Sequence, residues 1–383
     1  MTLHSTNQLN VSGDRFTVTY SIWGSESVAN EISRAICVEE TAEFPEVLIA
    51  EGDIRNHVLG QVENFQHLEG DHYQAVLSYA IEITSFELLQ FMNVVYGNIS
   101  MIPNIKVNRF DLPDSLLNHF KGARFGIEGL RKLINIPTRA FLAAAIKPMG
   151  LSPVEFAQMA YDCAIGGMDI VKDDHGLTNQ TFAPFKERVA RCAESVQKAN
   201  QKTGENCLYA ANISGHFEEL VEKAVYAKQA GAGGLMVIPS LVGWDFMRYL
   251  AGEDNLGLPI ICHPAFHGSY MTSQRTGFSY FSMYGQLVRL AGGDVTIFPN
   301  YLGRFSAAKE SCMEVVKGTK EKMGHLKTIF PSPGGGATLN NIPEMLDVYG
   351  QDMVYLMGGG LHHGESLVKS CQEFRHMVEL YKN

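Results

Sequence analysis

The spacing of apolar residues divides the chain into two regions. In the first, stretches rich in β-branched and aromatic residues predict strands at residues 15–23, 57–68, 72–83 and 104–113. Apolar residues spaced three and four apart predict helices at residues 26–41 and 85–98. The order strand, helix, strand, strand, helix, strand is typical of a ferredoxin-like α+β fold, in which two helices cover one face of a sheet.

From residue 139 onward the pattern becomes a repeat of strand, loop and helix. Almost continuously apolar runs lie at residues 140–148, 168–174, 207–214, 234–240, 259–265, 295–300, 327–333 and 353–360. A segment with helical apolar spacing follows each run. Such runs are typical of parallel strands buried on both faces, and eight regular units favour a closed (β/α)8 TIM barrel over an open sheet.

These patterns predict two domains. We expect a ferredoxin-like α+β domain at residues 1–125 and a (β/α)8 barrel at residues 126–383. Residues 110–138, with their spaced prolines and glycines, are interpreted as the connection between the two rather than as a ninth barrel unit.

Composition narrows the range of partners. The chain has 383 residues, is 45% hydrophobic and carries a formal net charge of -10 without any basic run. These values favour a globular enzyme and argue against nucleic acid or a membrane surface as partner, because both attract clustered lysine and arginine. No signal-peptide pattern and no uncharged apolar stretch of about 18 residues occurs, so we expect a cytoplasmic protein that acts on a small molecule.

The seven cysteines do not form a recognisable framework. They are scattered along the chain, odd in number and never spaced as CxxC. This spacing predicts neither a disulfide scaffold nor a zinc knuckle, and it indicates buried thiols in a reducing compartment.

Polar side chains stand at nearly every predicted strand end of the barrel. In this fold the active site lies at the carboxyl ends of the strands, so these residues are the candidates for chemistry. They are Lys147, Lys172, Asp174, His175, Asn212, Ser214, Ser240, His263, His267, Asn300, Ser332 and His362.

Two glycine-rich segments follow the last two strands. Gly334 and Gly335 belong to "PSPGGGA", and Gly358 and Gly359 belong to "MGGGLHHG". The loops after strands seven and eight of such barrels commonly bind phosphate, because glycine lets backbone N–H groups approach an anion closely. The segments predict a phosphate site, the simpler alternative being that the glycines only permit tight turns.

The role of Lys172 stays open on the residues alone. A lysine beside two aspartates can form an ion pair, act as a Schiff-base nucleophile, or take up CO2 as a carbamate. A carbamate would turn the cation into an oxygen-bearing anion that could hold a divalent metal together with Asp174.

A resemblance to a known protein family bears on the choice among these three roles of Lys172. The segments "AAIKPMGLSP", "GGMDIVKDDHG", "ICHPAFHG", "SPGGGA" and "MGGG", together with "VYGN" in the first region, resemble the signatures of the RuBisCO large-chain family. The resemblance covers almost the whole chain. The fold that it implies is the one that the hydrophobic pattern predicts.

The resemblance also implies roles for individual residues. Lys172 would carry the CO2-derived carbamate and bind a divalent metal with Asp174 and His175, most simply Mg2+. Lys147 would face the substrate, and the fifth-strand histidines His263 and His267 would hold phosphate and polarise oxygens. The residues that would bind substrate oxygens and phosphate are Ser332, Gly334, Gly335, Gly358, Gly359 and His362. Asn98 would reach into the site of a neighbouring subunit, which implies a homodimer with shared sites.

Three departures separate this chain from the carboxylases of the family. Met149 follows Pro148 where carboxylases have a second lysine, Pro264 stands where an arginine follows the histidine, and residues 296–309 have no lysine at the loop tip. A charge-assisted contact is worth about 1.5–3 kcal/mol, so a bisphosphate would bind poorly. The pattern therefore predicts a non-carboxylating RuBisCO-like protein of form IV that keeps the enediolate chemistry.

His175 is a further departure, because the family usually has glutamate there. A neutral imidazole makes the metal site less negative and is also compatible with Mn, Zn or Fe. The alternative is that His175 only forms hydrogen bonds to Asp174 or to a metal-bound water.

These departures lead to a main hypothesis and three others. The main one is a C–C lyase, a decarboxylase or transcarboxylase of a singly phosphorylated keto sugar acid such as 3-oxo-isoapionate 4-phosphate. The second is an enolase or isomerase of methionine salvage that acts on a methylthio ketose phosphate. A Schiff-base lyase using Lys147 or Lys172 and a catalytically silent relative complete the set.

Overall fold

The computed structural model describes residues 8–49, 51–305 and 307–381. Its contacts group the chain into two compact units. The first unit comprises Met1–Lys121, His267–Leu287 and Lys322–Leu326, and the second comprises Gly122–Phe266, Val288–Glu321 and Lys327–Asn383. The first unit thus takes up two segments from the later part of the chain. The predicted division into domains after residue 125 stays a prediction.

The first unit contains a five-stranded sheet in the order β10-β4-β1-β3-β2. Its strands are β1 (Arg15–Trp23), β2 (Gln61–Glu69), β3 (His72–Ala80), β4 (Ile105–Asp111) and β10 (Gly277–Phe278). β1 pairs antiparallel with β3 and β4, and β2 pairs antiparallel with β3. The order of the first four strands is the predicted ferredoxin-like arrangement. The short strand β10, which pairs parallel with β4, was not predicted.

Local sequence explains where the helices of this unit begin. They are α1 (Glu26–Glu39), α2 (Leu88–Tyr96), α3 (Asp114–Leu117) and α10 (Gly268–Met271). Ser25 caps α1, since its side chain accepts a hydrogen bond from the Val28 backbone N–H. Tyr20 of β1 donates a buried hydrogen bond of 2.7 Å to the carbonyl of Val95, which fixes α2 on the sheet.

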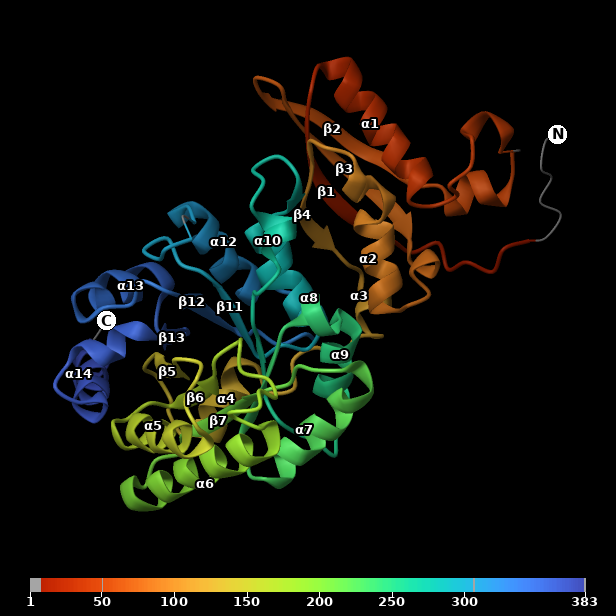
Figure 1. The fold of residues 1–383 in the computed structure, drawn as a ribbon. Helices are drawn as coiled ribbons and strands as arrows, with labels where there is room; N and C mark the ends of the chain where they lie inside the picture. The colour runs from red at the N-terminus through yellow and green to blue at the C-terminus, as the bar shows by residue number, and fades with distance from the viewer. Residues whose placement is uncertain (1–7, 50, 306, 382–383) are drawn as a thin grey trace. The chain divides into compact units, whose positions relative to one another are not determined.

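The second unit is a closed barrel of eight parallel strands, as the apolar runs predict (Figure 1). The strands are β5 (Phe141–Ile146), β6 (Ile170–Asp173), β7 (Leu208–Asn212), β8 (Gly234–Val237), β9 (Ile260–Cys262), β11 (Val295–Pro299), β12 (Phe330–Gly334) and β13 (Val354–Met357). Nearly all of their residues are buried, because the interior side chains fill the barrel and the outer ones face helices.

Helices follow the strands around the barrel (Figure 1). They are α5 (Pro153–Ile165), α6 (Phe185–Thr203), α7 (Leu220–Gln229), α8 (Pro239–Val242), α9 (Trp244–Gly252), α11 (Val288–Leu290), α12 (Lys309–Lys320), α13 (Ile342–Tyr349) and α14 (Leu367–Leu380). Ser152 and Glu155 form a capping box at the start of α5. α6 ends where Gly204 adopts a φ of 78°, which favours glycine. No helix in the described part of the chain is long and apolar enough to cross a membrane.

The segment predicted to be a connection contains a helix that belongs to the barrel. α4 (Gly126–Ile134) places Ile127, Leu130 and Ile134 in the same apolar core as Phe141 and Phe330. The Asp294 carboxylate accepts hydrogen bonds from the backbone N–H groups of residues 125 and 126, which fixes the start of the helix. The barrel is therefore packed by this helix at the end where its strands begin. The site must be sought at the opposite end.

Candidate active site at the carboxyl ends of the barrel strands

Lys172 lies near the end of β6 and is almost completely buried, with 2% of its surface exposed. Its Nζ donates a hydrogen bond of 2.9 Å to the carbonyl oxygen of Asp173 and contacts the Met236 Sδ at 3.3 Å. A thioether is a weak acceptor, so the ammonium loses hydration without full compensation. Burial, with a contribution from Lys147, lowers the pKa of Lys172 to about 8 in spite of the nearby aspartates. This environment favours a neutral amine more than bulk water does.

Asp174 connects two other predicted residues. Its Oδ1 lies 3.2 Å from Lys147 Nζ, and its Oδ2 lies 3.3 Å from His175 Nδ1. Burial alone would raise the pKa of Asp174, but the hydrogen bond from His175 and the charges of Lys147 and Lys172 outweigh it and hold the pKa well below its usual range. The carboxylate is therefore ionised and lies between two cationic or hydrogen-bonding side chains.

The imidazole of His175 stacks on that of His263. The ring centroids are 4.8 Å apart and the planes differ by 11°. The backbone N–H of Ala265 donates to His263 Nδ1 at 3.1 Å, so Nδ1 accepts and the proton of a neutral ring resides on Nε2. The hydrogen bond from Ala265 thus fixes the tautomer of a neutral His263 ring.

Gly358, the residue directly after β13, borders the same group. A Cβ placed on Gly358 would lie 3.2 Å from Lys147 Nζ, so a larger residue would crowd the lysine. Gly359 follows it at the start of a short turn that also contains His362, whose side chain is exposed.

The seventh strand contributes Ser332 and the glycines that follow it. Ser332 is buried and donates a 3.0 Å hydrogen bond to the Val354 carbonyl, so its hydroxyl proton is directed at the barrel wall. Gly334 ends β12, and Gly335 adopts a φ of 91°, a conformation that favours glycine.

Two predicted residues belong to the first unit. Asn98 donates hydrogen bonds from Nδ2 to Glu39 at 3.0 Å and to Glu43 at 3.3 Å. His267 is fully buried, and burial lowers its pKa to about 4. Their roles in substrate binding stay predictions.

The second unit also contains contributors that the sequence did not reveal. Arg188 and Tyr209 bind the carboxylate of Asp173, the residue between Lys172 and Asp174. The sequence could have indicated Arg188, because it lies on the same face of α6 as Phe185 and Cys192. A buried arginine on such an apolar face needs an acidic partner. No comparable signal marks Tyr209.

The donor set fits a divalent metal only if Lys172 takes part. Within the described ranges, no three histidine, cysteine, aspartate or glutamate side chains gather so that they could hold a metal ion. Asp174 and His175 would supply two ligands. A carbamate on Lys172 would supply the third, and a buried amine with a lowered pKa, whose second acceptor is only a thioether, is suited to form one. The residues therefore fit the predicted carbamate and metal together, rather than the metal alone.

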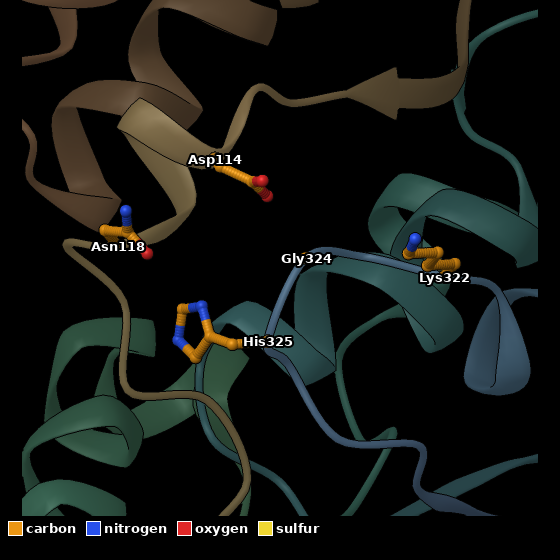
Figure 2. A pocket seen from close by; sticks show the side chains of 5 residues that line it. All are labelled: Asp114, Asn118, Lys322, Gly324 and His325. Atoms are coloured by element: carbon orange, nitrogen blue, oxygen red, sulfur yellow. The ribbon is translucent and has the colours of Figure 1, made fainter.

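A polar cavity of about 630 Å³ lies elsewhere, in the first unit. Its lining residues are Asp114, Asn118, Lys322, Gly324 and His325 (Figure 2). None of the predicted site residues lines it.

Comparisons with known proteins agree with this architecture. The family model described as "Ribulose bisphosphate carboxylase large chain, catalytic domain" matches residues 126–379. The ribulose bisphosphate carboxylase-like protein 1 of Rhodopseudomonas palustris is 32% identical over 362 residues, which are 94% of this chain and 96% of that protein. The 5-methylthioribulose-1-phosphate isomerase of Rhodospirillum rubrum is 31% identical over 349 residues, 91% of each chain. A 2,3-diketo-5-methylthiopentyl-1-phosphate enolase of Bacillus cytotoxicus is 33% identical over 277 residues, 72% of this chain and 67% of that enzyme.

Solved structures show the same similarity. The crystal structure of a Rubisco-like protein from Rhodopseudomonas palustris has a TM-score of 0.86 and 32% identity, and the match covers 96% of this chain and 99% of that one. A rubisco-like protein from Alicyclobacillus acidocaldarius has a TM-score of 0.87 and 27% identity, with 96% and 94% covered. Since the family model matches more than half of the chain and the similarity spans both units, the chain belongs to the RuBisCO large-chain family, as one of its RuBisCO-like proteins.

Proposed function

We propose that this protein is an enolising enzyme that moves a proton next to the carbonyl group of a methylthio ketose monophosphate, without breaking a C–C bond. The observation that carries the proposal is the close contact of the Asp174 carboxylate with both Lys147 and His175, beside the buried Lys172. Two kinds of methionine-salvage enzyme, an isomerase and an enolase, are among the relatives that share at least 31% of their aligned residues with this chain. They favour this function over the decarboxylase that the sequence alone suggested first.

Lys147 is the proposed proton-transfer group. Lys147 is a cation when it pairs with Asp174, so it must first release its proton to solvent. The amine then accepts the proton from the carbon next to the carbonyl, and the electron pair of the broken C–H bond moves to the carbonyl oxygen. The Asp174 carboxylate, 3.2 Å away, stabilises the resulting ammonium. Delivery of a proton to the enolate oxygen completes an enolisation. For an isomerisation, Lys147 instead returns the proton to the former carbonyl carbon, while the neighbouring hydroxyl transfers its proton to the former carbonyl oxygen and becomes the new carbonyl group.

His263 is the proposed oxygen-binding group. The Ala265 N–H donates to Nδ1, so the proton of the neutral ring is on Nε2. An Nε2–H donor stabilises the negative charge that develops on the enediolate oxygen. The stacked ring of His175 restricts the orientation of His263.

The residues that would hold a metal are Asp174, His175 and carbamylated Lys172. A divalent ion there, Mg2+ in the first place and Mn, Zn or Fe as alternatives compatible with His175, would supply Lewis acidity towards the substrate's carbonyl oxygen. The CO2 that forms the carbamate is then a cofactor of the protein and not its substrate.

Met149 supports a substrate with an apolar end. It follows Lys147 by two residues and 52% of its surface is exposed. A Cβ on Gly176 would lie 2.8 Å from Met149 Cε, so the methionine packs on the backbone just after His175. Where carboxylases of the family have a lysine, this site presents a thioether. A methylthio group would contact it favourably, whereas the carboxylate of a sugar acid would lose a cationic partner.

The glycines after β12 and β13 and Ser332 support a single phosphate site on the barrel. We also propose that the protein is a homodimer in which Asn98 of one chain reaches into the active site of its partner. An octameric Rubisco of Pyrococcus horikoshii, 25% identical with a TM-score of 0.89, is an example of a relative with this fold that forms an oligomer.

The test is proton exchange in deuterated water. The protein, supplied with Mg2+ and bicarbonate, is incubated with 5-methylthioribulose 1-phosphate, and deuterium incorporation is followed by NMR. We expect incorporation without CO2 release, loss of exchange in Lys147→Met, and unchanged exchange in the cavity variant His325→Ala. Release of CO2 from a 3-oxo sugar-acid phosphate, with no exchange into the methylthio compound, would instead support the decarboxylase.

A further inference from the structure

Asp173 stands between Lys172 and Asp174 but is buried in a different environment. Its side chain and that of Arg188 are both 0% exposed, and they form an ion pair in which Arg188 Nη2 lies 3.2 Å from Asp173 Oδ2. Tyr209 donates from its hydroxyl to Asp173 Oδ1 at 2.7 Å. The backbone N–H of Asn212 donates to Oδ2 at 3.1 Å. Successive strand residues point to opposite faces, so fixing Asp173 on one face also fixes the direction in which its neighbours leave β6.

The same network extends to the loop that follows β6. Arg188 donates from Nη1 to the Ala183 carbonyl and from Nη2 to the Thr178 carbonyl, each at 2.9 Å. Asn212 donates from Nδ2 to the carbonyls of His175 at 3.0 Å and Leu177 at 2.9 Å. Four carbonyls between residues 175 and 183 are thus held by two side chains.

We infer that Arg188, Asp173, Tyr209 and Asn212 form a positioning network that sets the orientation of Lys172, Asp174 and His175. The inference rests on the proposed function, because that function assigns the carbamate and metal to these three residues. A buried ion pair is by itself weak evidence for stability, since apolar residues of similar size often stabilise a fold as well. Every hydrogen bond described above ends on the β6 strand end or its loop. This distribution is what a positioning role requires.

Metal affinity separates this role from a purely structural one. The wild-type protein and the variants Tyr209→Phe, Arg188→Lys and Arg188→Met are titrated with Mn2+ in the presence of bicarbonate, and free Mn2+ is followed by EPR. The carbamate is followed by NMR with 13C-bicarbonate, and thermal unfolding is measured on the same samples. Tyr209→Phe removes one hydroxyl and keeps the ring, so it provides a folded variant even if loss of the arginine prevents folding.

Arg131 offers a matched control in the same unit. It binds Asp352 at 2.7 Å and the carbonyls of Ile136 and Arg139, but at the opposite ends of the strands. It also donates to the Gln351 carbonyl at 3.1 Å. Arg131→Met therefore removes an ion pair and three carbonyl contacts far along the barrel from Lys172.

We expect Tyr209→Phe and Arg188→Lys to bind Mn2+ at least about tenfold more weakly and to show a weaker carbamate signal, as is common when groups that orient metal ligands are lost. Arg131→Met should unfold at a lower temperature and keep its Mn2+ affinity. The positioning role is overturned if the affinities of Tyr209→Phe and Arg188→Lys equal that of the wild type, or if Arg131→Met loses affinity to the same degree. Failure of the wild type itself to bind Mn2+ with bicarbonate would overturn the metal site of the proposed function.

Discussion

At the scale of single residues, the surroundings of Lys172 disfavour the charged form of its amine. Its nitrogen is buried beside a backbone carbonyl and the sulfur of Met236, and burial lowers its pKa to about 8. A methionine of similar length would occupy the same space without the cost of burying a charge. Sequence alone could place Lys172 at a strand end, but it could not identify Met236 as its neighbour, since the two are far apart along the chain.

We expect Lys172→Met to keep or raise the melting temperature while proton exchange falls by at least about a hundredfold. The substitution removes a poorly solvated amine and also removes the group proposed to carry the carbamate. Circular dichroism and the deuterium assay measure the two effects. A variant that retains exchange would show that no carbamate is needed.

Met149 is the residue at which substrate preference should change. In Met149→Lys a flexible cation replaces the thioether beside Gly176, so we expect KM for the methylthio ketose phosphate to rise about tenfold, a typical effect of one misplaced apolar group. Met149→Leu should change KM little because it keeps an apolar side chain of similar volume. Steady-state kinetics with the methylthio compound and its hydroxyl analogue test this, and equal KM values for all three proteins would contradict it.

At the scale of elements, Glu40 joins the end of α1 to the turn after α2. Its Oε1 accepts from the Ile99 N–H at 2.7 Å and its Oε2 from the Gly97 N–H at 3.2 Å. Burial raises the pKa of Glu40 to about 7, although these two hydrogen bonds act in the opposite direction and the neighbouring Glu39 and Glu43 add to the increase. The carboxyl that holds this turn therefore titrates near neutral pH.

This shift predicts how stability depends on pH. The folded protein binds the Glu40 proton more tightly than the unfolded chain, whose pKa is near 4.5, so its contribution is complete at low pH and is lost as the pH rises through about 7. Glu40→Gln cannot titrate. We expect the melting temperature of Glu40→Gln minus that of the wild type to increase between pH 4.5 and 7. Parallel pH profiles for the two proteins would refute the prediction.

The elements themselves differ in how well the sequence predicts them. All eight barrel strands were found because each is short, apolar and buried on both faces. α4 was missed because Gly126 and Gly129 suggest a connection, whereas the helix is stabilised by packing Leu130 and Ile134 into the barrel core. β10 was missed because a stretch of two residues is too short to show an alternating pattern of apolar and polar positions. Only its pairing with β4 makes it a strand.

At the scale of the whole molecule, the proposed homodimer predicts complementation. Lys172→Met and Asn98→Ala should each be inactive. The first removes a residue of the chain's own barrel site, and the second removes the residue that the chain contributes to its partner's site. If the two are unfolded and refolded together, about half of the dimers are hybrids, and each hybrid contains one site without either substitution. We therefore expect about a quarter of wild-type exchange activity in the mixture. No recovery, with hybrids demonstrated by mass spectrometry, would mean that Asn98 does not serve a partner's site.

The sequence by itself determined the two folds, the strand ends at which an active site is predicted, and the family. These follow from local periodicity, glycine positions and short motifs, which are readable one segment at a time. Only the tertiary structure decided that Asp174 lies between Lys147 and His175, that Met149 covers Gly176, and that Arg188 and Tyr209 bind Asp173. The physical reason is that closing a barrel brings together residues from different strands, and which side chains then meet depends on register and packing that no single segment encodes.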